Sequence, residues 1–277
     1  MTIADDSLRK RPVPAAPRAH GFLGTVGASV LDVLQIVGEG AFLFFGTLRR
    51  LRLSGRTWSR TLTQLVRIGT DTVPLAFLVS LFVGMVLVVQ AADQLQQYTQ
   101  EILGSIVGLA MTKELGPVIM GFLIAGRVGS SVAAEIGSMT VNDEINALKT
   151  MDIDPILFLS VPRFIAMVVS LPMLVLYADV IGIAGGALVV AADPAVTISV
   201  HQYLDNLTQW INFKDIVVGL IKAFVFAVVV SVIACTFGFR TKGGSEGVAV
   251  STTAAVVWSF VLIIVFDYII VRLAILF

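Results

Sequence analysis

The stretch that decides the fold is MTKELGPVIMGFLIAGRVGSSVAAEIGSM, residues 111–139. Its first half places Lys113, Glu114, Gly116 and Pro117 inside an otherwise apolar run. Its second half becomes polar and leads into a segment with an amphipathic pattern, before apolar sequence resumes at residues 154–155. A charged position inside an apolar run long enough to cross a bilayer is typical of a membrane transport component.

The composition places the chain among all-α polytopic membrane proteins. Hydrophobic residues make up 57% of the sequence and charged residues 14%, with a mean hydropathy of +0.92, against roughly 45–50% and 25% in soluble domains. The apolar residues form long uncharged runs, unlike the short alternating segments of a β-barrel. One cysteine, Cys235, and two distant histidines provide neither a disulfide framework nor a metal site. We expect no metal and no cofactor in this chain.

The hydropathy pattern predicts an interfacial helix followed by five spans. Residues 1–20 combine charges with prolines and are expected to form a disordered cytoplasmic tail. Residues 21–62 are expected to hold an amphipathic interfacial helix and a basic connection, with a full span as the alternative for residues 21–48. The five-span domain covers residues 63–277. Its spans are expected at residues 73–92 (with an extension from residue 63), 102–126, 164–192, 216–239 and 248–273.

The distribution of lysine and arginine predicts the orientation. With a cytoplasmic N-terminus, the inside segments (residues 1–72, 127–163 and 240–247) hold fifteen of these residues, and the outside segments hold two. Positive charge is enriched on the cytoplasmic side of membrane proteins. We therefore expect the N-terminus inside and the C-terminus outside.

Lys113 and Glu114 are expected near the middle of the bilayer. A charge there costs on the order of 2.5–3.5 kcal/mol, so it should face a partner or a hydrated cavity. Neighbouring residues point about 100° apart on a helix, so the two cannot fully neutralise each other. Lys222 is a candidate partner for Glu114, and Asp179 and Asp267 are acids that compete with Glu114 for Lys222. The cluster could line a substrate cavity or could be a structural ion pair; both readings remain open.

Gly116 and Pro117 follow the charged pair directly. Proline removes a backbone hydrogen bond, so we expect a kink and a carbonyl that neighbouring groups must satisfy. In the middle of the polar connection at residues 127–163, Thr140 and Asp143 have the spacing of a capping box. An apolar ridge, formed by Val141, Ile145, Leu148 and Met151, then predicts a three-turn cytoplasmic helix. That helix could dock in a groove of a soluble partner or lie against its own protein.

Nothing in the sequence indicates an enzyme active site. The glycines at residues 121 and 126 have the spacing of half a phosphate loop, but Arg127 and Val128 replace the lysine and hydroxyl residue, and the segment lies in a span. The GGSEG turn at residues 243–247 is a better match for a flexible connection. We therefore expect a chain that does not itself bind ATP.

The stretch from Lys113 to Arg163 resembles the hallmark of the MlaE family of ABC-transporter permeases. GMVLVVQ at residues 84–90, LIKAFVF at residues 220–226 and GSEGVAVSTTAAVV at residues 244–257 extend the resemblance. It implies a homodimeric permease of a Gram-negative inner membrane that moves phospholipid between the two membranes. The implied partners are a cytoplasmic ATPase dimer, which would bind ATP and magnesium, a periplasmic hexamer of MCE domains and, in many members, a STAS-domain protein.

The resemblance also implies two functional sites. In this sequence the residues that correspond to the family's lipid cavity would be Tyr98, Lys113, Glu114 and Lys222. The helix that couples to the ATPase would cover residues 135–151, with the expected contacts Glu135, Asp143, Glu144, Leu148 and Met151. One departure concerns Lys113, which stands where the family is associated with arginine; lysine keeps the charge but loses the bidentate fork.

Two other functions remain open at this point. A secondary transporter could be driven by protons through Glu114, Asp179 and Asp267, although five spans without an inverted repeat speak against it. The same ABC permease could also carry a sterol-like lipid. A co-purifying ATPase would distinguish the first alternative from the leading hypothesis.

Overall fold

The computed structural model describes residues 22–50, 55–95 and 100–276. Contacts divide the chain into two compact units, residues 1–41 and 42–277. Every regular element within the described ranges is helical, so the all-α prediction is confirmed. The predicted tail at residues 1–20 lies outside the described residues.

The elements follow one another with short connections. α1 (Phe22–Arg49) begins in the first unit and ends in the second. The second unit continues with α2 (Gly55–Gly69), η2 (Thr70–Thr72), α3 (Val73–Leu95), α4 (Leu103–Ala110), η3 (Met111–Leu115), α5 (Gly116–Ile124), η4 (Ala125–Gly129), α6 (Ser130–Val141), α7 (Glu144–Thr150), η5 (Ile156–Ser160), α8 (Val161–Ala192), α9 (Val200–Trp210), α10 (Phe213–Arg240) and α11 (Gly244–Leu276).

Six helical segments among the described residues are long and apolar enough to cross a membrane. Five of them correspond to the predicted spans, and the sixth is the end of α1, for which the sequence left an interfacial or a spanning position open. The segments are Leu31–Arg49, Trp58–Leu95, Leu103–Val141, Ile156–Ala192, Phe213–Arg240 and Gly244–Leu276.

The second and third predicted spans have different bounds from those expected. Helical structure does not stop at residue 126 but continues through η4 and α6 to Val141, and the next segment already begins at Ile156. The 39 residues from Leu103 to Val141 would measure about 58 Å at 1.5 Å per residue, against about 30 Å of hydrocarbon. The polar residues after 126 therefore belong to the long helix itself, and only the loop around α7 interrupts it.

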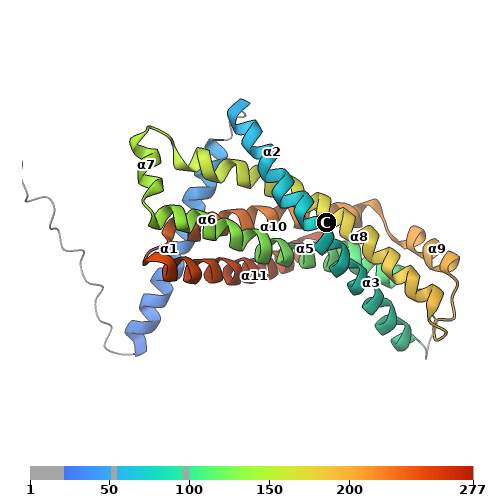
Figure 1. Ribbon diagram of the computed structural model, residues 1–277. Helices are drawn as coiled ribbons and strands as arrows, with labels where there is room; N and C mark the ends of the chain where they lie inside the picture. The colour runs from blue at the N-terminus through green and yellow to red at the C-terminus, as the bar shows by residue number, and fades with distance from the viewer. Residues whose placement is uncertain (1–21, 51–54, 96–99, 277) are drawn as a thin grey trace, which may run out of the picture. The chain divides into compact units, whose positions relative to one another are not determined.

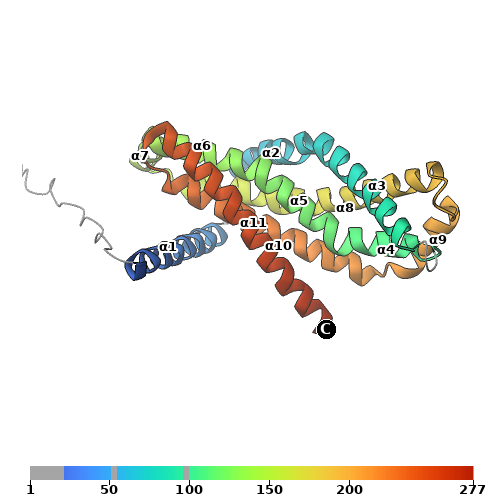
Figure 2. The ribbon, with the colours of Figure 1, turned by 90° about the horizontal axis from the view of Figure 1, so that it is seen from below.

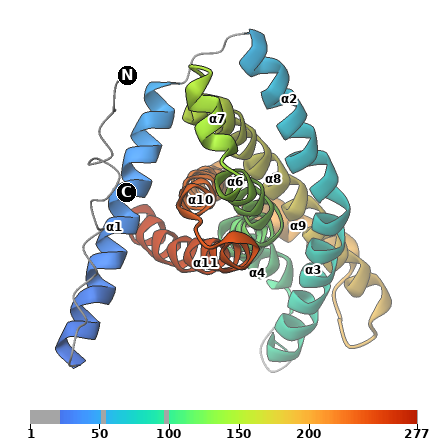
Figure 3. The same ribbon diagram turned by 60° about the vertical axis from the view of Figure 1, so that its left-hand side comes forward.

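The long helices of the second unit pack into two adjoining groups. α8 runs along α2, α3 and α10, and α6 packs against both α10 and α11 (Figures 1 and 3). α3 meets α8 through small residues: a Cβ atom on Gly84 would lie 1.8 Å from the carbonyl oxygen of Gly182. Only glycine permits this close approach of the two helices.

α7 and α9 lie at opposite ends of the second unit (Figure 2). α9 is held by Tyr203, whose ring is completely buried and whose hydroxyl donates to the carbonyl oxygen of Ile183 at 3.4 Å. Burial raises the pKa of the Tyr203 phenol, which therefore stays neutral. At the same end, Gln100 accepts hydrogen bonds from the backbone and hydroxyl of Thr197 at 2.7 and 2.8 Å. These contacts fix the loop between α8 and α10.

Candidate functional site

A π-helical turn carries the two intramembrane charges of the long helix. In η3, the backbone N–H of Gly116 donates to the carbonyl oxygen of Met111, five residues earlier. Pro117 comes next and has no N–H to donate, so the wide turn lies directly before the missing hydrogen bond. The structure thus accommodates the predicted kink position with a π turn, a feature that is frequent at functional sites.

The approach of α10 to this turn depends on Gly219. A Cβ atom at that position would lie only 2.3 Å from the carbonyl oxygen of Thr112. Lys222 follows three residues later and therefore projects from the same face of α10. Because the two backbones come this close, the Lys222 side chain reaches the carboxylate of Glu114.

Lys222 lies between two acids from different helices. Its side chain is 0% exposed, and its Nζ donates to Glu114 Oε2 at 2.6 Å and lies 2.9 Å from Asp267 Oδ1 on α11. The Glu114 side chain is 44% exposed. One cation thus faces two carboxylates, and the excess negative charge lies on the accessible side of the cluster. Of the candidate acids, Glu114 and Asp267 both pair with Lys222.

Lys113 pairs with a different helix. Its Nζ lies 2.7 Å from Asp215 Oδ1 in the first turn of α10, and the Lys113 side chain is 42% exposed. Asp215 also closes a capping box with Asn212. The sequence reasoning missed Asp215 because it assigned residue 215 to a polar loop. The Asn-x-x-Asp spacing at the start of an apolar run was the signal that could have found it.

Asp179 does not join the cluster, although it was a candidate partner of Lys222. It is buried in α8, its Oδ1 atom has no hydrogen-bond partner, and no cation lies within ion-pair distance among the described residues. Instead it packs on the backbone of Gly116, where a Cβ atom would lie 2.0 Å from Asp179 Oδ1. Asp179 therefore packs against the π turn without neutralising any charge on it.

The charged residues lie at similar distances from the ends of their helices. Measured along their helices, Lys113 is about 15 Å from Leu103, Lys222 about 14 Å from Phe213, and Asp267 about 14 Å from Leu276. Half of a hydrocarbon layer is also about 15 Å. This agreement supports the expected position of the cluster near the middle of the bilayer.

An apolar groove adjoins the cluster. A cavity of about 260 Å³ is lined by Leu115, the residue after Glu114, and by α3 residues Phe82, Val83, Val86, Leu87 and Gln90. The outer face of α3 continues this surface with exposed apolar side chains at helical spacing, namely Leu75, Leu78, Phe82, Val86 and Val89. The arrangement places an accessible charged group beside a surface that suits hydrocarbon.

The predicted coupling helix is two helices rather than one. α6 ends at Val141, and Asp143, in the left-handed conformation (φ 59°), starts the short α7. Thr140 is not a cap, because its hydroxyl donates to the carbonyl oxygens of Ile136 and Gly238. The predicted capping box is therefore wrong, since the chain turns between the two residues that were to form it.

The apolar ridge of this segment also points inward. Ile145 and Leu148 are buried in a small cluster with Leu159, whereas Met151 is 61% exposed. Asp143 and Glu144 are exposed as well. Of the residues expected to contact a partner, Asp143, Glu144 and Met151 are accessible, and Leu148 packs within its own chain.

Glu135 belongs to an ion-pair network on the long helix. Its Oε1 lies 2.7 Å from Arg163 Nη2, and its Oε2 accepts from Arg67 Nη1 at 3.3 Å. Arg163 is only 5% exposed. Glu135 thus ties α6 to α2 and α8, which the sequence reasoning did not foresee. Tyr98, the remaining predicted lipid contact, lies outside the described residues.

Comparisons with known proteins agree with this architecture. The family model described as "Permease MlaE" matches residues 61–273. A probable ABC transporter permease protein of Rickettsia typhi is 36% identical over 249 residues, which cover 90% of this chain and 95% of that protein. The intermembrane phospholipid transport system permease protein MlaE of Haemophilus influenzae is 34% identical over 250 residues, covering 90% and 95%.

A plant protein is similar as well. Protein TRIGALACTOSYLDIACYLGLYCEROL 1, chloroplastic, of Arabidopsis thaliana is 38% identical over 213 residues, which cover 76% of this chain and 60% of that protein. The family match spans all five predicted membrane segments and the charged cluster between them. The chain therefore belongs to the MlaE family of ABC-transporter permeases.

Proposed function

We propose that this chain is the permease subunit of an ATP-driven transporter that moves phospholipid between the inner and outer membranes of a Gram-negative bacterium. The observation that carries the proposal is the fully buried Lys222 held between Glu114 and Asp267 beside an apolar groove. An amphipathic lipid needs both a polar binding site for its headgroup and an apolar surface for its acyl chains. A structural ion pair alone would not need its carboxylate to be 44% exposed.

The accessible charges suit the two ends of a zwitterionic headgroup. Lys113 is 42% exposed and uses one contact on Asp215, so its ammonium can still donate to a phosphate. Glu114 can accept from a headgroup amine while Lys222 holds its other side. Lysine binds phosphate as a point charge, without the bidentate pair of N–H groups that arginine offers. Acyl chains would lie along the exposed apolar stripe of α3.

ATP hydrolysis would take place in a separate subunit. ABC permeases work with an ATPase partner, and family membership implies that partner and a dimer of permeases. In our proposal the ATPase contacts the exposed face of α7 through Asp143, Glu144 and Met151. The buried contacts of Ile145 and Leu148 would pass its motion to α6 and α8. This chain would then need no nucleotide, magnesium or other cofactor of its own.

The remaining partners and the location follow the same proposal. The lysine and arginine distribution supports a cytoplasmic N-terminus and α7, and therefore a periplasmic α9 and C-terminus. A periplasmic MCE-domain hexamer would receive the lipid at the α9 end, and a STAS-domain protein is a further possible cytoplasmic partner. The multi-pass chain would lie in the inner membrane as a homodimer.

The proposal is tested by transport in a defined system. The permease is reconstituted in vesicles with its co-purified ATPase and the periplasmic ring, and transfer of labelled phospholipid to acceptor vesicles is followed. We expect transfer that depends on ATP and is absent with a hydrolysis-deficient ATPase. Transfer of a sterol but not of phospholipid would correct the substrate, and transfer without the ATPase would contradict the proposal.

A second candidate function rests on Asp179. A buried carboxyl without a cationic partner is a feature of proton-coupled transporters as well as of structural contacts. A proton-driven transporter would move its substrate in ATPase-free vesicles when a pH gradient is applied. Asp179→Asn would abolish this gradient-driven transport. The ABC proposal instead predicts that neither the wild type nor Asp179→Asn transports substrate in response to a pH gradient.

A further inference from the structure

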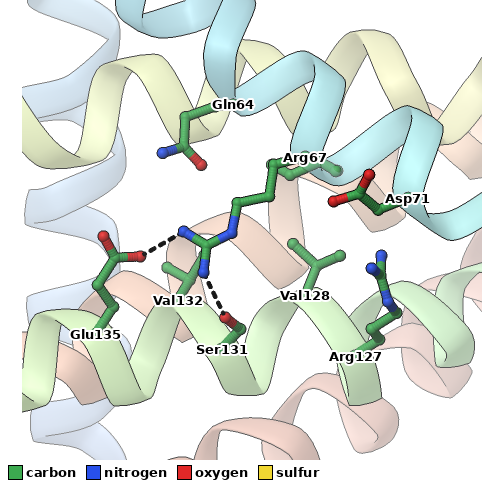
Figure 4. Close-up of a pocket in the computed structure, with 9 residues that line it drawn as sticks. Gln64, Arg67, Asp71, Arg127, Val128, Ser131, Val132 and Glu135 are labelled. Atoms are coloured by element: carbon green, nitrogen blue, oxygen red, sulfur yellow. Dashed lines mark hydrogen bonds and ion pairs between the residues drawn. The ribbon is translucent and has the colours of Figure 1, made fainter.

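A second cavity, which has a polar lining, lies on the same long helix, on the α7 side of the charged cluster. It has a volume of about 200 Å³ and opens between α2 and the η4–α6 segment (Figure 4). Polar and charged side chains from both helices point into it, while Ile68, Val128 and Val132 form its apolar part. The polar lining consists of Gln64, Arg67, Asp71, Arg127, Ser131 and Glu135.

The charges around this cavity do not balance. Glu135 is shared between Arg67 and Arg163, which leaves one positive charge over in that network. Arg127 and Asp71 contribute one charge of each sign, and within the part of the chain that the structure describes neither is in an ion pair. The lining itself holds two arginines and two carboxylates; with Arg163, which is buried and does not line the cavity, the group has three arginines and two carboxylates. A single negative charge placed in the cavity would neutralise the group.

Arg127 is held in a position to bind that charge. Its Nη1 donates to Thr72 Oγ1 at 2.5 Å, and Thr72 is completely buried in the short η2 turn. This contact uses one of the five N–H groups of the guanidinium, so the others remain available. Arg67 has a similar spare capacity, because it reaches Glu135 and, at 3.5 Å, the hydroxyl of Ser131.

Both π turns of the long helix carry charged residues. η3 carries Lys113 and Glu114, and η4 carries Arg127. Arg127 lies 14 positions after Lys113, which corresponds to about 21 Å along the helix, or about two-thirds of the hydrocarbon thickness. Because Lys113 is expected near the middle of the bilayer, Arg127 would lie in the headgroup region on the α7 side, where a phospholipid carries its phosphate.

We propose that this cavity binds the phosphate diester of a phospholipid headgroup and is a second lipid-binding site, on the α7 side of the membrane. The inference rests on the proposed function for the identity of the molecule that carries the phosphate. The diester bears one negative charge, which matches the excess of one cation. The paired N–H groups of Arg127 and Arg67 suit phosphate oxygens better than a lysine would. The volume, equal to about six or seven waters at ~30 Å³ each, accommodates a headgroup but not a whole lipid.

The test uses the full permease complex in phosphatidylethanolamine vesicles. A trace of phosphatidylethanolamine with a photoreactive group on its headgroup amine is activated, and labelled peptides of α2 and α6 are quantified by mass spectrometry. Arg127→Gln should lower this labelling by about tenfold, which corresponds to ~1.4 kcal/mol. Arg127→Lys should retain an intermediate level, since it keeps the charge without the fork.

A second variant protects the test against misfolding. Gln64 is half-buried in the cavity wall and has no hydrogen bond of its own within the described part of the chain, so Gln64→Glu adds a negative charge at nearly constant shape. It should lower the labelling of α2 and α6 as well. The matched change Gln202→Glu, on the exposed face of α9, should leave that labelling unchanged.

Several results would overturn the inference. Labelling that is the same in Arg127→Gln and Gln64→Glu as in the wild type would show that the lipid does not depend on these charges. Full competition by inorganic phosphate at millimolar concentration would identify a free anion as the ligand. Lipid transport by the same wild-type vesicles is measured in parallel. Transport without charge-dependent labelling defeats only this inference, whereas labelling without ATP-dependent transport defeats the proposed function.

Discussion

Replacing Lys222 by methionine isolates the contribution of the buried cation. Methionine keeps most of the apolar stem and removes the charge, which leaves Glu114 and Asp267 facing each other without a counter-ion. Breaking a buried ion pair by removing one partner costs about 3–5 kcal/mol. Glu114 and Asp267 are 44% and 20% exposed and can be partly rehydrated, so we expect the lower end, ~3 kcal/mol.

The chain offers its own probe for this measurement. Cys235 is the single cysteine of the sequence and is completely buried in α10. A fluorogenic maleimide should therefore react with Cys235 only as the protein unfolds on heating. With about 2–4 °C per kcal/mol for a chain of this size class, Lys222→Met should lower the midpoint by roughly 6–12 °C.

The control removes all three charges together. In Lys222→Met/Glu114→Gln/Asp267→Asn no charge is left unpaired, and replacing a complete buried ion pair by neutral groups is often neutral or stabilising. We expect this variant to regain most of the lost midpoint but not lipid transport. An unchanged midpoint in Lys222→Met, or a triple variant that is less stable than the single one, would refute the reasoning.

Two further substitutions test the positions of α10 and α7. Gly219→Ala should disturb the contact of α10 with η3 and lower the unfolding midpoint measured at Cys235, because the added Cβ would meet the Thr112 carbonyl. Gly126→Ala should leave this midpoint unchanged, because nothing lies within 4 Å of the added Cβ. Equal midpoints in the two variants would contradict this expectation. Met151→Asp should weaken co-purification of the ATPase by about tenfold or more while leaving the unfolding midpoint unchanged. Leu148→Asp should instead lower the unfolding midpoint, because Leu148 is only 9% exposed. An ATPase that co-purifies fully with Met151→Asp would contradict the proposed contact.

The sequence predicted the helical class and named Lys222 as a candidate partner of Glu114. Both follow from the cost of placing charge and unpaired backbone in hydrocarbon, which leaves few arrangements open. Asp267 could be named only as a competitor, because the spacing of residues within one helix says nothing of the distance between helices. Lys113 pairs with Asp215, which was not considered because the start of α10 was predicted a few residues too late.

The features that the sequence did not reveal depend on backbone geometry. A π turn at Lys113–Glu114 adds one residue to a turn without altering the apolar pattern around it. The break between α6 and α7 depends on the left-handed conformation of Asp143, a state that aspartate tolerates better than most residues. That break turned the predicted ridge inward and buried Leu148. Glu135 was assigned to a partner surface by the family resemblance, and its two arginine partners could not be foreseen because they come from other helices.

The central claim is that Glu114 acts on the transported lipid and not only on Lys222. Its most direct test is the rate of ATP-dependent phospholipid transfer by the reconstituted complex with Glu114→Gln, which keeps the shape of the side chain and removes its charge. The account predicts a loss of about tenfold or more, with the ATPase still bound and basal ATP hydrolysis retained. Transfer at the wild-type rate would contradict it and would leave Glu114 as a structural partner of Lys222.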